Sequence, residues 1–215
     1  GSGFMLAHLA ESGETVALDY RSIAPLASDP DLFRMGDGEV DMDALTHGAR
    51  AAAVPGTVAG LYEAWQRWGS LPWPDLVAPA RELAAKGIIV THDLAFALSQ
   101  GEQTMRQFPS SAAIYMRPDG SGWQPGERLV QSDLAWSLTQ IMEGGADAFY
   151  KGELAERIVA AVRADKGLMT LEDLAGYTVK ERDLVTTDYR GYRVVSMPPV
   201  SAGGLTLIQM LNMLS

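Results

Sequence analysis

The chain has 215 residues, of which 47% are hydrophobic and 20% are charged, so it can bury a substantial core as one large domain or two small ones. Its 27 acidic and 17 basic residues give a net charge of −10, which argues against binding to the phosphate backbone of a nucleic acid. The sequence contains no cysteine, which excludes disulfides, thiolate nucleophiles and cysteine-based zinc sites. No apolar run approaches the roughly 20 residues that span a bilayer, so no transmembrane segment is predicted, and no signal peptide is visible.

The first elements predicted along the chain are two strands. Phe4–Ala10 is an apolar run of strand length, Glu11–Glu14 has the composition of a turn, and Thr15–Tyr20 alternates apolar and polar residues. Together they predict a β-hairpin with a glycine-containing loop.

An arginine, Arg21, follows the second predicted strand directly. A guanidinium on the end of a rigid strand can reach into a cleft and bind a carboxylate through two parallel hydrogen bonds. Arg21 is therefore our candidate for a residue that binds a substrate carboxylate. The alternative is an arginine that lies on the surface or in a structural ion pair.

The middle of the chain is predicted to be mostly helical. A polar segment, Ser28–Asp43, is predicted to be a loop, and Met105–Gly126, rich in Pro, Gly and Ser, is predicted to be a long irregular excursion. Thr57 is a plausible N-cap of the first long helix, and Gly69 is its stop. The apolar spacing predicts helices over Thr57–Trp68, Asp75–Lys86, His92–Gln100, Leu129–Glu143 and Gly152–Asp165.

Strand patterns return near the end of the chain. Thr170–Asp173 fits a helix capping box with Asp in place of the usual Glu or Gln. Val179–Val185 and Tyr192–Met197 alternate as strands, and Leu205–Leu214 is predicted to be helical. Strands at both ends and helices between them indicate an α+β or α/β fold, in which the two distant strand pairs could share one sheet.

Few residues point to catalysis by their spacing alone. The three histidines, His8, His47 and His92, have no metal-ligand spacing and are predicted to be structural or solvent-facing. No G-x-S-x-G nucleophile elbow is present. Two hydroxyl residues, Ser201 and Thr206, could act as nucleophiles, but the sequence supplies neither with a base.

Gly203 and Gly204 enter the last predicted helix and allow two interpretations. Their backbone N–H groups could bind an oxyanion or a carboxylate. We favour the structural interpretation, a tight strand-to-helix turn in which a side chain would clash.

Eight segments occur in an order that is specific to one protein family, and they are spread over nearly the whole chain. They are Gly1–Leu6, Leu18–Pro25, Val54–Gly60, Leu76–Ala80, Phe149–Gly152, Met169–Tyr177, Tyr189–Tyr192 and Met197–Gly204. In this combination the chain resembles the large subunit of γ-glutamyltranspeptidases.

The resemblance implies an α+β N-terminal nucleophile hydrolase fold, a four-layer αββα sandwich of which this chain is a part. It implies a precursor that cleaves itself into a large and a small subunit, and a nucleophilic threonine at the new end of the small subunit. The γ-glutamyl group of a donor such as glutathione would pass to that threonine and then to water or an amino acid. The family arginine that binds the donor α-carboxylate falls on Arg21, no metal or other cofactor is implied, and a periplasmic or secreted location is favoured.

Two departures from the family pattern qualify these expectations. Ser22 stands where the family commonly has glutamate, so a related acylase acting on cephalosporin or glutaryl groups is an alternative. We expect residues 1–215 to be a single domain, incomplete at both ends, and inactive alone because the threonine lies outside them. A non-catalytic binding module on the same fold is the alternative from another functional class.

Overall fold

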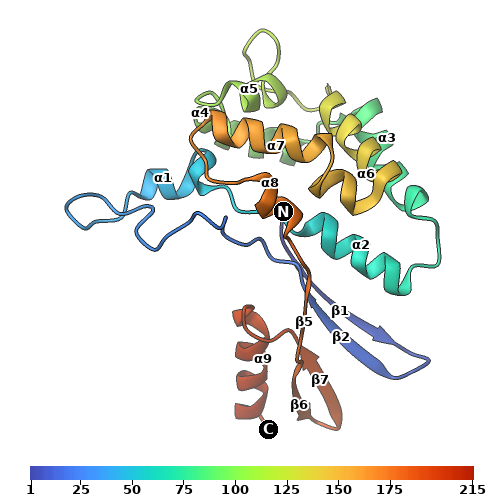
Figure 1. The fold of residues 1–215 in the computed structure, drawn as a ribbon. Helices are drawn as coiled ribbons and strands as arrows, with labels where there is room; N and C mark the ends of the chain where they lie inside the picture. The colour runs from blue at the N-terminus through green and yellow to red at the C-terminus, as the bar shows by residue number, and fades with distance from the viewer. The chain divides into compact units, whose positions relative to one another are not determined.

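The computed structural model describes all residues, 1–215, and divides into two compact units. The first unit combines Gly1–Ser70 with Ala146–Ser215, and the second is Leu71–Gly145. Figure 1 shows the helices and strands of both units. No helix has the length and apolar character needed to cross a bilayer.

The first unit contains most of the strands. Its elements are β1 (Phe4–Leu9), β2 (Glu14–Asp19), α1 (Met42–Thr46), the 3₁₀ helix η1 (Ala49–Ala51), α2 (Thr57–Trp68), α7 (Glu153–Ala164), α8 (Leu171–Ala175), β5 (Lys180–Arg182), β6 (Val185–Tyr189), β7 (Tyr192–Ser196) and α9 (Ala202–Met213).

The second unit is mainly helical. Its elements are α3 (Trp73–Lys86), β3 (Ile88–Ile89), α4 (His92–Met105), α5 (Pro109–Tyr115), β4 (Arg128–Leu129) and the greater part of α6 (Ser132–Tyr150). Gly145 interrupts α6 with φ 62° and ψ −150°, at the boundary between the two units.

A three-stranded antiparallel sheet in the order β1-β2-β5 organises the first unit. The predicted hairpin is confirmed, with Phe4 paired to Asp19 at one end and Leu9 to Glu14 at the other. On its other edge β2 pairs with β5, which places Lys180 opposite Asp19. Part of the second strand pair therefore joins the first in one sheet, as the sequence suggested.

Alternation along β2 separates a core face from a charged face. Val16, Leu18 and Tyr20 are buried and pack with Trp68 of α2. Residues at odd positions of β2 point to the other face of the sheet, because successive side chains of a strand alternate. Asp19 lies on that second face.

The prediction of one continuous strand over Val179–Val185 was wrong in part. In the structure β5 ends at Arg182, and a separate antiparallel hairpin of β6 and β7 starts at Val185. The two-residue turn at Arg190 and Gly191 has φ values of 51° and 84°, as expected for a type I′ hairpin turn. An arginine with positive φ is uncommon, which explains why the turn is hard to recognise in the sequence.

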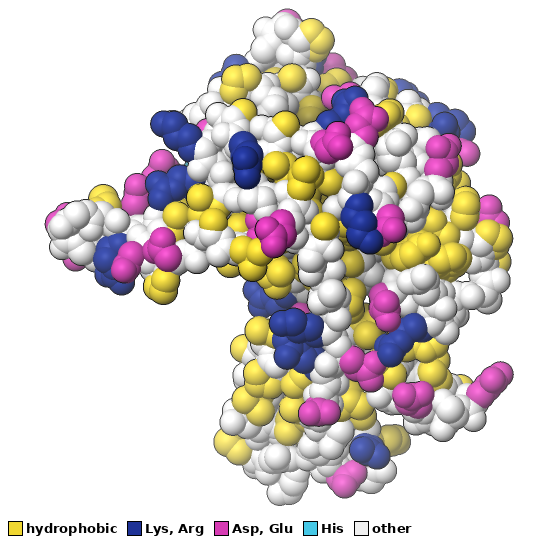
Figure 2. All heavy atoms as spheres, viewed as in Figure 1, with side chains coloured by type: hydrophobic (Ala, Val, Ile, Leu, Met, Phe, Trp, Pro, Cys, Tyr) yellow, Lys and Arg dark blue, Asp and Glu magenta, His cyan; other side chains and the backbone are white.

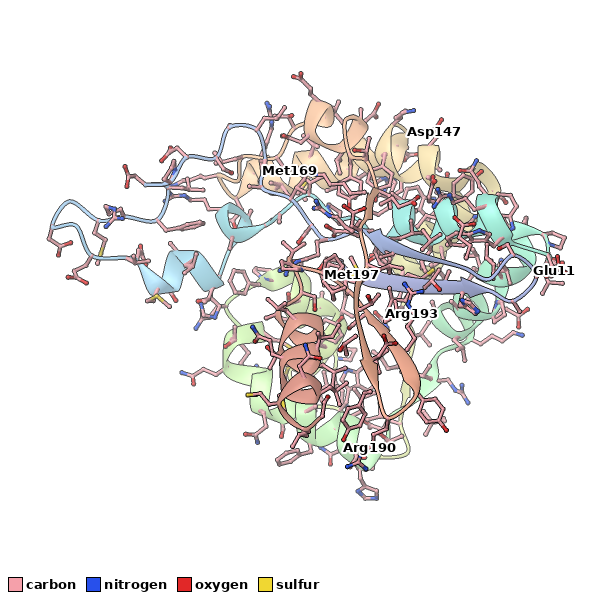
Figure 3. The ribbon with its side chains drawn as sticks, turned by 90° about the horizontal axis from the view of Figure 1, so that it is seen from below. Glu11, Asp147, Met169, Arg190, Arg193 and Met197 are labelled. Carbon is pink, nitrogen blue, oxygen red and sulfur yellow. The ribbon has the colours of Figure 1, made fainter.

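α9 packs against the β6–β7 hairpin. It begins three residues before the predicted start and buries Gly204 and Ile208. Five large apolar residues at the end of the chain remain exposed, and hydrophobic side chains are visible in this region in Figure 2. They are Leu205, Leu207, Met210, Met213 and Leu214. Figure 3 shows Arg190 at the tip of the hairpin and Glu11 at the tip of the β1–β2 hairpin.

The bounds of α2 confirm the prediction, but its N-cap lies one residue earlier than predicted. Gly56, not Thr57, is the N-cap, and no side chain caps this end. The first turn is instead tied to Tyr150, whose hydroxyl donates to the Pro55 carbonyl at 2.8 Å and accepts from the Ala59 N–H at 3.2 Å. A side chain at position 56 would meet the Tyr177 hydroxyl, since its Cβ would lie 2.0 Å from that oxygen.

The prediction of an irregular excursion over Met105–Gly126 was wrong in part. The segment contains α5, which begins at Pro109, a residue whose fixed φ favours the first position of a helix. α3 starts at Trp73 and not at the predicted Asp75. Pro74, in the first turn of this helix, also has a fixed φ that suits a helix start. Within the second unit, the Trp73 indole N–H donates to the Ile141 carbonyl at 2.9 Å.

The predicted capping box at Thr170 is confirmed and reaches further than the sequence indicated. The Thr170 hydroxyl accepts from the Asp173 N–H, and the Asp173 carboxylate accepts from the Thr170 N–H and hydroxyl at 2.7 Å each. The same carboxylate accepts from the N–H of Leu26 at 2.6 Å. Asp173 is only 5% exposed. Its hydrogen bonds to Thr170 and Leu26 join α8 to the loop that follows β2.

We expect Gly204→Ala to destabilise the protein by about 1–3 kcal/mol, because the new methyl group would lie 2.0 Å from the Met197 carbonyl oxygen. Gly203→Ala is the matched control, since its nearest neighbour would be the Ser201 hydroxyl at 3.7 Å. Urea denaturation of the two variants measures the difference. Equal stabilities would contradict the structural interpretation of this turn.

We expect Asp173→Asn to lower the free energy of unfolding by about 1–3 kcal/mol at neutral pH, because a buried acceptor of three hydrogen bonds becomes a partial donor. Burial raises the pKa of Asp173, but the hydrogen bonds from Leu26 and Thr170 outweigh it and hold this pKa below the ordinary 3.8. A lowered pKa gives stabilisation that is complete above the ordinary value and is lost as the pH falls through the folded-state value.

The difference between wild type and Asp173→Asn should therefore shrink in urea denaturations performed below pH 3.8. Asp41→Asn is the control, because Asp41 caps α1 through one hydrogen bond to the Ala44 N–H and Asn caps helices as well as Asp. If the difference in unfolding free energy between wild type and Asp173→Asn did not change with pH, it would contradict the lowered pKa of Asp173.

Candidate substrate-binding site

Arg21 projects from a backbone that is fixed on both sides. Its N–H donates to Oδ1 of Asp19 at 3.0 Å, and its carbonyl accepts from the Tyr177 hydroxyl at 2.7 Å. The side chain is exposed, and its guanidinium lies 5.9 Å from the centre of the Phe4 ring. Because the backbone of Arg21 is already ordered, binding a ligand would order only the side chain.

The side chain of Arg21 lines a cavity of about 360 Å³. The charged residues of the lining are three basic and one acidic, so the cavity carries an excess of positive charge. They are Arg21, Lys180, Arg182 and Asp19. Ser22 and Tyr177 also line the cavity and contribute hydroxyl groups.

The only carboxylate of the cavity is already bound. Asp19 is 6% exposed, and its Oδ2 accepts from Nε and Nη2 of Arg182 at 3.0 and 2.8 Å. Its Oδ1 accepts from the Arg21 N–H. Because Asp19 and Arg182 neutralise one another, the positive potential of the cavity comes from Arg21 and Lys180.

A pair of stacked tyrosines, Tyr150 and Tyr177, contacts the backbone of Arg21 through the Tyr177 hydroxyl. The rings of Tyr150 and Tyr177 lie 5.7 Å apart and nearly parallel. Burial raises the pKa of Tyr177 well above its usual range, and the neighbouring Tyr150 and Asp19 raise it further. Burial likewise raises the pKa of Tyr150 to about 12. Both hydroxyls stay protonated near neutral pH, so Tyr177 remains a donor to Arg21.

The chain after Arg21 is tied down as well. Ile23 and Val54 exchange two backbone hydrogen bonds of 3.2 and 2.9 Å, and the N–H of Leu26 donates to Asp173. The segment that carries Arg21 and Ser22 is thus fixed to two distant parts of the chain, at Val54 and around Asp173.

The other candidates from the sequence do not line this cavity. His8 and His92 are exposed, His47 is half-buried, and no group of acidic or histidine side chains has the arrangement of a metal site. Gly204 leaves no room for a side chain, which supports the structural interpretation of the turn. Ser201 precedes α9 as its N-cap without a side-chain hydrogen bond there.

The sequence did not identify the residues that position Arg21. Asp19 is the last residue of β2 and lies only two residues before Arg21, so its closeness along the chain could have indicated it. Arg182 is 163 residues from Asp19, and Tyr177 is 156 residues from Arg21. Only the pairing of β5 with β2 brings them together, and no local pattern encodes that pairing.

Known proteins match this chain along its whole length. The family model described as "Gamma-glutamyltranspeptidase" matches residues 1–215. The chain is 41% identical over 215 residues to the glutathione hydrolase proenzyme of Escherichia coli strain K12, covering 100% of this chain and 37% of the relative. It is 36% identical over 220 residues to the Acylase ACY 1 proenzyme of Pseudomonas sp. strain SE83, covering 100% of this chain and 39% of that relative.

A solved structure agrees. The γ-glutamyltranspeptidase of Helicobacter pylori superposes with a TM-score of 0.96 at 40% identity, covering 99% of this chain and 60% of that one. This likeness confirms the α+β class and the N-terminal nucleophile hydrolase fold. The chain spans little more than a third of the length of the curated relatives that it matches.

The order of the eight sequence segments, the family match over every residue and the identity to these relatives agree with one another. They show that this chain belongs to the γ-glutamyltranspeptidase family, a family of enzymes.

Proposed function

We propose that this chain is a portion of the large subunit of a γ-glutamyltransferase or hydrolase. The enzyme would transfer the γ-glutamyl group of glutathione-like donors to water or to amino acids, and Arg21 would bind the donor α-carboxylate. The observation that carries the proposal is the exposed guanidinium of Arg21, held by its backbone at the wall of a cavity with excess positive charge.

The chemistry of the cavity suits an amino-acid-like acyl donor. The planar guanidinium presents two parallel N–H groups to a carboxylate, which fixes both the position and the orientation of the ligand. Asp19 makes no ion pair with the side chain of Arg21; its carboxylate binds the Arg182 guanidinium and the Arg21 N–H instead. Asp19 and Tyr177 are therefore positioning residues for Arg21.

The nucleophile would come from outside this chain. No histidine lines the cavity, so Ser22 has no imidazole base there. We propose that the nucleophile is the N-terminal threonine of a small subunit cut from the same precursor, with its own α-amine as the base. The name "proenzyme" carried by the E. coli and Pseudomonas relatives supports a processed precursor.

We expect Arg21→Ala in the processed enzyme to raise the donor KM and to lower kcat/KM roughly 30- to 1,000-fold, because the charge-assisted pair is lost. This factor corresponds to a loss of about 2–4 kcal/mol of transition-state stabilisation. Arg21→Lys should retain part of the activity, because it keeps the charge but not the two parallel bonds. Steady-state kinetics with a γ-glutamyl anilide measures both.

Arg163→Ala is the matched control for Arg21→Ala, since Arg163 lies exposed on α7 and does not line the cavity. Unchanged kinetics of Arg21→Ala would end the assignment of this residue. A processed enzyme without any γ-glutamyl turnover would favour the non-catalytic binding module instead.

A second candidate function, an acylase acting on glutaryl-type groups, is favoured by two observations. Ser22 contributes no charge to the cavity, and the chain is 36% identical to the Pseudomonas acylase proenzyme. A glutaryl group keeps the carboxylate that Arg21 would bind but lacks the α-amine.

The two candidates differ in their preference between γ-glutamyl and glutaryl anilides. If the enzyme is a γ-glutamyltransferase, we expect the γ-glutamyl donor to have the higher kcat/KM. We also expect Ser22→Glu to increase this preference about two- to fivefold, because the new carboxylate would attract the α-ammonium group. A higher kcat/KM with the glutaryl donor would favour the acylase.

A further inference from the structure

We propose that Lys180 forms a second anion subsite beside Arg21 and selects donors with a carboxylate in the leaving group. The inference rests on the proposed function and adds to it, because the γ-glutamyl group has one carboxylate, which Arg21 would bind. A second negative charge on the donor must then belong to the part that leaves.

The strand register places Lys180 on the face of the sheet that borders the cavity. Lys180 is directly opposite Asp19, and Arg182 is opposite Ala17. Residues opposite one another in an antiparallel pair point to the same face, and so do residues two apart along one strand. Asp19, Lys180 and Arg182 therefore share one face, and all three line the same cavity as Arg21.

The residue between the two cations points the other way. Glu181 is opposite Leu18, whose side chain is buried on the α2 side of the sheet. Its carboxylate pairs with Arg67 of α2 at 2.7 Å. The alternation of β5 thus places its acid on the α2 face and both of its bases on the cavity face.

Lys180 is exposed and has no carboxylate within ion-pair distance, although it is opposite Asp19. The Asp19 carboxylate instead accepts from Arg182 and from the backbone of Arg21. Lys and Arg side chains gather on the stretch of surface where β5 runs (Figure 2). The ammonium group of Lys180 and the guanidinium of Arg21 are consequently both available to an anionic ligand in this cavity.

A solvated lysine on an open surface would add little to binding, because exposed ion pairs are weak. The setting here differs in two respects. The cavity concentrates two uncompensated cations, and the chain as a whole is acidic with a net charge of −10. A local positive potential on an acidic protein attracts a donor with two carboxylates more strongly than a donor with one.

The test compares two donors in the processed enzyme that contains this chain. γ-Glutamylglycine carries the second carboxylate, and γ-glutamylglycinamide does not. The measurement is the ratio of their kcat/KM values, from release of glutamate without an added acceptor. Comparing this ratio between variants cancels the difference in intrinsic reactivity of the two donors.

We expect Lys180→Gln to lower the ratio about three- to tenfold relative to wild type, whereas Lys180→Arg keeps it near the wild-type value. Added salt should lower the wild-type ratio and leave that of Lys180→Gln nearly constant. Lys151→Gln makes the same change in net charge at a lysine that pairs with Asp147 and does not line the cavity, so its ratio should equal that of wild type.

Two results would overturn the inference. The ratio could stay at the wild-type value in Lys180→Gln, or the two donors could lose the same factor, which would place Lys180 against the shared γ-glutamyl part. If the proposed function were wrong, the result would be different: Arg21→Ala would leave the kcat/KM of both donors unchanged. Autoprocessing and circular dichroism of each variant establish that the measured protein is folded.

Discussion

The candidate site depends on the ion pair and the hydrogen bond that the buried carboxylate of Asp19 makes. One of its oxygens binds the Arg182 guanidinium, and the other binds the N–H of Arg21. A single acid therefore joins β5 to β2 and sets the direction in which the chain leaves the sheet. Removing Arg182 would leave the buried Asp19 carboxylate without its ion-pair partner, which is destabilising, so the pair constrains both strands at once.

Strand alternation distributes the charges of this region over two faces. On the α2 side, Leu18 packs into the core and Glu181 pairs with Arg67. On the other side, the charges of Asp19 and Arg182 neutralise one another. Arg21 and Lys180 remain as the unpaired cations of the cavity. A chain with a net charge of −10 thus has a local excess of positive charge at this cavity, because the potential there depends on nearby charges more than on distant, screened ones.

Elements defined by neighbouring residues could be predicted from the sequence. The β1–β2 hairpin, the capping box at Thr170 and the helix over Thr57–Trp68 all formed where the local pattern placed them. Elements that depend on distant partners could not. β5 is only three residues long and exists because β2 offers an edge, while the turn at Arg190 depends on a backbone conformation that its sequence does not signal.

The sequence by itself determined that an arginine follows a strand and that the order of motifs belongs to one family. Tertiary structure decided what surrounds Arg21: Tyr177 on its carbonyl, Asp19 fixed by Arg182, and Lys180 on the same face. The physical reason is that strand register fixes which side chains share a face. Register between segments more than 150 residues apart arises from the packing of the whole unit and not from any local propensity.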